Sequence, residues 1–162
     1  MPRGILLRGL LLIGIALMPA LSFCEEAEPD KYLELMRTDL KAKKVEILTE
    51  ALALSPQQAE TFWPIYRQYD VELAKLSDGR IALIKDYAQA YRSMTDATAD
   101  SLASRAFDLE GRRLALLRQY HKKVGKAVSP IIAARFAQVE ATINTLVDLQ
   151  IRSGLPLIEV KP

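Results

Sequence analysis

The stretch that decides the fold is residues 55–94, which read SPQQAETFWPIYRQYDVELAKLSDGRIALIKDYAQAYRSM. Ser55 suits the position before a helix, because its hydroxyl can accept a hydrogen bond from an otherwise unpaired N–H of the first turn. Pro56 fits the first helical position, and Gln58 can reach back to complete a capping box. The apolar residues that follow recur every three or four positions and are Phe62, Tyr66, Tyr69, Leu73, Leu76, Leu83, Tyr87, Ala90 and Met94. This periodicity predicts one long helix laid against another helix.

The flanking sequence predicts three further helices and no strand, so we expect an all-α single domain. The expected helices span about 30–53, 56–94, 96–127 and 130–152, followed by an apolar tail over 154–162. The residues expected to begin or cap them are Leu54, Ser55, Pro56, Gln58, Thr95, Ser129 and Pro130. A residue before proline avoids the α region, so the first helix should end before Pro56. Gly154 is placed to end the last helix.

The second and third expected helices are long enough to form an antiparallel hairpin with its tip near Thr95. In that register Gly79 lies opposite Gly111, and Arg80 lies beside Glu110. Each mid-helix glycine costs about 0.5–1 kcal/mol relative to alanine. Their coincidence favours a close approach of the two backbones, whereas the alternative is two unrelated flexible points.

The N-terminal segment 1–24 has the layout of a secretory signal peptide. Arg3 and Arg8 precede an apolar run over 9–18, and small residues follow it. The run is shorter than the roughly 20 apolar residues that a membrane span needs. Cleavage after Ser22 or after Cys24 fits this layout, and lipid anchoring through Cys24 is the alternative. We therefore expect a secreted, periplasmic protein without a stable membrane span after cleavage.

Charge and cysteine content exclude several classes of protein. The chain has 22 basic and 20 acidic residues, and two arginines lie within 1–24, so the exported part is neutral. A neutral chain does not suit nucleic-acid binding. Cys24 is the single cysteine, so packing rather than disulfide bonds must stabilise the fold.

The residues that enzymes use are scarce, and we expect no enzyme, no metal site and no cofactor. His121 is the single histidine and lies in a basic run of the third expected helix, which suits a surface residue. Metal sites usually combine histidine, cysteine or carboxylates at set spacing. No such tract and no glycine-rich nucleotide loop is present in the sequence.

An aromatic cluster stands out within the decisive stretch. Phe62, Trp63, Tyr66 and Tyr69 place four aromatic residues within eight positions. One interpretation is an aromatic core that joins helices and includes Phe136. The other is a surface that binds a partner, for which Trp63 is the strongest candidate because it points away from the face that the other three share.

The helix-start sequences resemble the LTxxQ motif of the periplasmic Spy/CpxP-like family. Residues 54–58, LSPQQ, match that motif with serine in place of threonine, and residues 128–136, VSPIIAARF, resemble its second copy with Ile132 in place of glutamine. Residues 94–96 add a third similar start. The resemblance implies a thin, cradle-like helical homodimer that acts as an ATP-independent chaperone, an envelope-stress adaptor or a metal-resistance protein. The chain departs from the metal-responsive branch in lacking histidine and methionine ligands, and from the chaperone branch in being neutral.

Two functions are expected from these observations. The first is a chaperone or stress-response protein that holds unfolded or envelope proteins against exposed apolar helix surface, without nucleotide. The alternative is a dedicated interaction module that binds one envelope or signalling partner, such as the sensor domain of a kinase.

Overall fold

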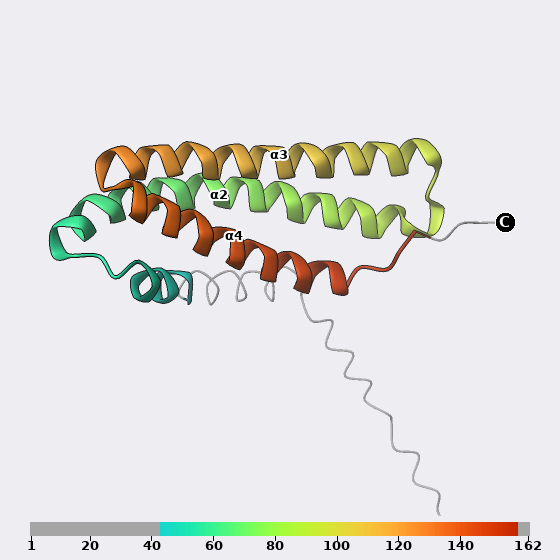
Figure 1. Cartoon of the computed structure of the whole chain (residues 1–162). Coiled ribbons are helices and arrows are strands. Elements are labelled where there is room, and N and C mark those ends of the chain that lie inside the picture. Colours follow the sequence, from blue (N-terminus) through green and yellow to red (C-terminus); the bar gives the residue numbers. More distant parts are fainter. Residues whose placement is uncertain (1–42, 159–162) are drawn as a thin grey trace, which may run out of the picture.

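The computed structural model describes residues 43–158, which are almost entirely helical and contain no strand (Figure 1). A helical segment over 43–52 comes first. The elements that follow are α2 (Pro56–Ala90), the short 3-10 helix η1 (Tyr91–Ser93), α3 (Asp96–Ala127) and α4 (Pro130–Ser153). The all-α class expected from the sequence is confirmed. The predicted signal peptide over 1–24, the start of the first helix near residue 30 and the end of the tail lie outside the described residues.

Side-chain caps mark where each long helix begins. Ser55 accepts a hydrogen bond from the N–H of Gln58 at 3.3 Å, and its own N–H donates to Oε1 of Gln58 at 2.9 Å, which completes a capping box. Thr95 accepts from the backbone N–H three residues later at 3.2 Å, and Ser129 does the same at 3.2 Å. These bonds satisfy N–H groups that have no partner within the helix.

The helix ends differ slightly from those expected. The regular helix α2 ends at Ala90 rather than Met94, because the chain tightens into η1 and then turns extended at Met94 and Thr95 before α3 starts. The first helical segment ends at residue 52, where Ala53 takes a left-handed conformation with φ of 47°. α4 continues one residue further than expected, to Ser153.

The helices α2 and α3 lie side by side and run in opposite directions (Figure 1). Near the tip, Arg105 pairs with Asp86 at 2.7 Å, and further back the Tyr120 hydroxyl donates to Glu72 at 2.6 Å. α4 returns along α3, and its C-terminal half diverges from α2 (Figure 1). The buried core therefore gathers at the opposite end of the molecule from η1. Its largest fully buried side chains are Leu48, Leu52, Phe62, Tyr69, Tyr120, Val124, Phe136 and Glu140.

The expected facing of the two glycines is wrong. A Cβ atom on Gly79 would lie 3.2 Å from Cδ2 of Leu109, whereas a Cβ on Gly111 would meet nothing within 4 Å. Gly111 is on the exposed side of α3, because the rotation of that helix turns Leu109 toward α2 instead. Arg80 likewise pairs with Asp148 of α4 rather than with Glu110. The register along the helices was approximately right, but the rotation about their axes was not.

Candidate functional site

Three of the four aromatic residues singled out in the sequence are buried. Phe62, Tyr66 and Tyr69 have exposed fractions of 0%, 4% and 0%. Their rings meet Phe136 of α4 edge-on, with centroids 5.9, 6.4 and 5.3 Å away. Trp63 is half-buried and packs edge-on against Phe62 at 5.2 Å. The structure thus places three rings in the core, and Trp63 is the member of the cluster that keeps part of its surface exposed.

A charged pair lies within this core. Glu140 is fully buried, and its carboxylate accepts hydrogen bonds from Nζ of Lys44 at 3.1 Å, from the Tyr69 hydroxyl at 3.0 Å and from the Tyr66 hydroxyl at 3.5 Å. Burial, followed by the charge of Glu140, raises the pKa of both tyrosines, so their hydroxyls stay protonated and donate. Because a buried charge is tolerated only when it is paired and hydrogen-bonded, this cluster fixes the first helical segment onto α2 and α4.

Sequence reasoning missed this pair, although a signal for Glu140 was present. Glu140 lies on the apolar stripe of α4, four residues after Phe136 and three before Ile143, where a charge is unexpected. Its partner Lys44 is 96 positions away, so no local spacing connects the two.

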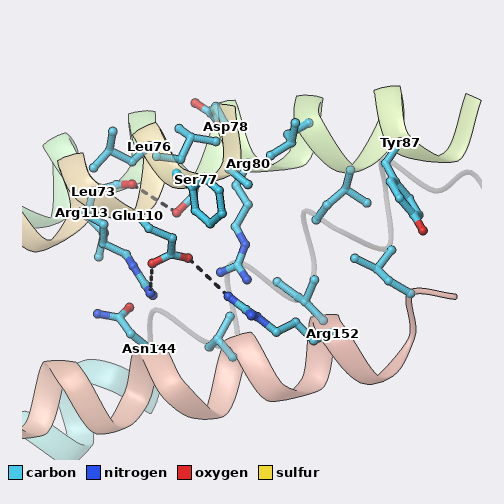
Figure 2. Close-up of a pocket in the computed structure, with 18 of the residues that line it drawn as sticks. Leu73, Leu76, Ser77, Asp78, Arg80, Tyr87, Glu110, Arg113, Asn144 and Arg152 are labelled. Atoms are coloured by element: carbon cyan, nitrogen blue, oxygen red, sulfur yellow. Dashed lines mark hydrogen bonds and ion pairs between the residues drawn. The ribbon is translucent and has the colours of Figure 1, made fainter. Parts of the chain in front are cut away.

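An apolar groove of about 840 Å³ opens where α4 diverges from α2 and α3 (Figure 2). All three helices contribute side chains to its wall. Representative apolar residues are Leu76, Leu83, Leu102, Ala106, Val147 and Ile151. We call this feature the apolar groove, and it begins at Lys44 and Leu73, beside the aromatic core, and extends to Tyr87 near the end of α2.

A charged network crosses the wall of the groove. Arg113 donates to Glu110 at 2.5 Å (Figure 2). Arg113 also donates to Asp148 at 2.8 Å, and Arg80 pairs with the same carboxylate. Burial alone would raise the pKa of Asp148, but the hydrogen bonds from Arg80 and Arg113 outweigh it, so that pKa is lowered. Arg152 approaches Glu110 at 3.9 Å from the exposed edge. The network holds α4 at a fixed distance from the α2–α3 pair while the groove beside it stays apolar.

The chain after α4 closes the far end of the groove. The Tyr87 hydroxyl donates to the carbonyl of Pro156 at 2.5 Å, and the Tyr91 hydroxyl donates to that of Leu157 at 3.0 Å. Leu155 and Ile158 add apolar side chains to the groove at this end. The described part of the predicted tail is therefore docked on α2 and η1.

Other sequence candidates contribute no further site within residues 43–158. His121 is half-buried on α3, outside the groove. In that described range no three histidine, cysteine or carboxylate side chains are arranged to share a metal ion. None of its helices combines the length and apolar character needed to cross a membrane.

Comparison of the chain with protein-family models, curated proteins and solved structures found no match.

Proposed function

We propose that the chain is an exported, periplasmic helical binding protein that acts as an ATP-independent chaperone or envelope-stress protein of the Spy/CpxP type. It holds apolar segments of unfolded or envelope proteins in the apolar groove. The observation that carries this proposal is the groove itself, since a contiguous apolar surface of this kind in a small protein is typical of a site for another chain.

The mechanism requires no covalent step. An apolar helix or strand of the client buries its side chains against Leu83, Leu102 and Val147, and release follows when the client folds and buries the same side chains internally. The arginines on the groove wall are held by Asp148 and Glu110, so they keep the groove open without presenting a strong charge. Binding of this type is reversible and tolerates many sequences, because it depends on apolar area.

A pair of matched variants on α4 tests the groove. Ile151 lines the groove, whereas Leu149 is 65% exposed and lies outside it. We expect the parent protein to suppress aggregation of a reduced model client at an equimolar ratio, and Ile151→Asp to lose most of this effect because a carboxylate resists burial against apolar client surface. Leu149→Asp should behave as the parent.

The measurement is light scattering of the client with each protein, with melting temperatures recorded to show that both variants fold. An absence of suppression by the parent, or equal losses in the two variants, would contradict the proposal.

The alternative is a dedicated interaction module with one envelope or signalling partner. The charged network favours it, because fixed arginine and carboxylate groups beside an apolar groove suit recognition of one defined surface. Cross-linking in an envelope extract distinguishes the two: a chaperone yields many partners at low occupancy, and a dedicated module yields one. In either case we propose that the chain works as a homodimer, as the family resemblance implies.

A further inference from the structure

The first helical segment enters the gap between α2 and α4 at the point where the apolar groove begins. Lys44 reaches Glu140 of α4 at 3.1 Å, and the same amino group lies 6.0 and 5.9 Å from the ring centroids of Tyr66 and Tyr69 of α2. Lys44 also lines the groove. The segment is therefore held between the two helices whose divergence forms the groove.

The direction of this segment is set by a second contact. Arg135 donates to the carbonyl of Leu52 at 3.4 Å, whereas Lys44 pairs with Glu140. Lower residue numbers in the segment thus lie beside higher numbers in α4, and the two run antiparallel. A helix continued from residue 43 back to residue 30 would extend about 20 Å at 1.5 Å per residue. That path leads past Asn144, Val147 and Ile151, which line the groove.

The sequence of residues 30–42, DKYLELMRTDLKA, fits this path. Leu33, Met36 and Leu40 continue, at spacings of three and four, the side of the helix that carries Lys44 and Leu48. The apolar spacing of the segment therefore matches the apolar wall of the groove that it would meet.

We propose that residues 30–42, which lie outside the described residues, continue the first helix along the apolar groove and place Leu33, Met36 and Leu40 in it. The groove then has an occupant within its own chain, and a client enters only by displacing this segment. Occupancy of the groove by residues 30–42 does not depend on the proposed function, whereas competition between this segment and clients rests on it.

Cysteine cross-linking tests the occupancy. In the full-length chain with Cys24→Ser, Leu40→Cys is combined with Leu73→Cys on the groove wall, or with Leu114→Cys, which is 58% exposed on the outer side of α3. We expect the first pair to form an intramolecular disulfide at least tenfold faster than the second in dilute solution. Equal rates, or a disulfide between two chains, would overturn the proposal, the latter by identifying a second copy as the occupant.

Hydrogen exchange gives an independent measurement that needs no disulfide. Substituting Leu33, Met36 and Leu40 together by aspartate should speed amide exchange in residues 143–151 several-fold. The matched substitution of Lys31, Thr38 and Ala42, which a helix would place on its opposite side, should leave that exchange unchanged. The proposal would be overturned if amide exchange in residues 143–151 stayed unchanged in both triple variants.

The disulfide-linked protein then tests the competition. If the segment and the client share the groove, oxidised protein should lose most of its suppression of client aggregation, and reduction should restore it. Undiminished suppression by fully linked protein would overturn the competition and the groove as client site, while the disulfide itself would still support the occupancy.

Discussion

At the residue scale, the pair formed by Lys44 and Glu140 decides how the first helical segment is held. We expect Lys44→Met to lower the free energy of unfolding by about 3–5 kcal/mol, because it leaves the carboxylate of Glu140 buried without its cation. Adding Glu140→Gln should recover part of this loss, since the neutral amide still accepts from the tyrosine hydroxyls. Urea denaturation of the single and double variants measures both effects.

The neighbouring residue supplies the control for that experiment. Lys43 pairs with Glu46 at 2.9 Å on the exposed side of the same segment. Lys43→Met should therefore change the stability little, because an exposed ion pair contributes little. Similar losses for Lys43→Met and Lys44→Met would show that the buried pair has no special role.

Asp148 gives the stability a predictable dependence on pH. Its pKa in the folded state is lowered by Arg80 and Arg113, so the group stabilises the fold above its unfolded pKa, near 3.9. This contribution is lost as the pH falls through the lower, folded-state pKa. Asp148→Asn should therefore be less stable than the parent at pH 7, and the difference should shrink at pH 3. Urea midpoints at the two pH values check this, and a constant difference would contradict it.

At the scale of the helices, the two mid-helix glycines should respond differently to alanine. Gly111→Ala should raise the free energy of unfolding by about 0.5–1 kcal/mol, because its Cβ meets open space and alanine favours the helix. Gly79→Ala should gain less or lose stability, since its Cβ would press on Leu109 at 3.2 Å. Thermal unfolding of both variants compares them, and an equal gain at both positions would indicate that Gly79 is not tightly packed.

At the scale of the whole molecule, the helix lengths set the shape. α3 has 32 residues and so extends about 48 Å at 1.5 Å per residue. We expect light scattering to give twice the mass of the exported chain, and small-angle scattering to give an elongated particle. A monomer at all concentrations would remove the homodimer from the proposed function.

The helix starts were predictable because capping is local. Ser55 and Gln58 are three residues apart, and the side chain of each accepts a hydrogen bond from the backbone N–H of the other. The same holds for Thr95 and Ser129, whose hydroxyls bond N–H groups three residues later. The end of α2 was less predictable, because its last turn tightens where the chain must reverse toward α3.

The apolar groove could not be predicted in this way. It depends on the angle at which α4 leaves α2, and on the rotation that points Val147 and Ile151 inward. A small rotation about a helix axis moves a side chain from core to surface without changing the sequence periodicity. Rotation about the helix axes is also the reason why Gly111 does not face Gly79 and why Arg80 pairs with Asp148 instead of Glu110.

The sequence by itself therefore determined the all-α class and the starts of three helices, because these depend on hydrogen bonds and apolar spacing between near neighbours. Only the tertiary structure decided that Phe62, Tyr66 and Tyr69 are buried, that Lys44 meets Glu140, and that a groove opens beside Asp148. Those contacts join residues up to 96 positions apart, and they form only where the helices bring them together.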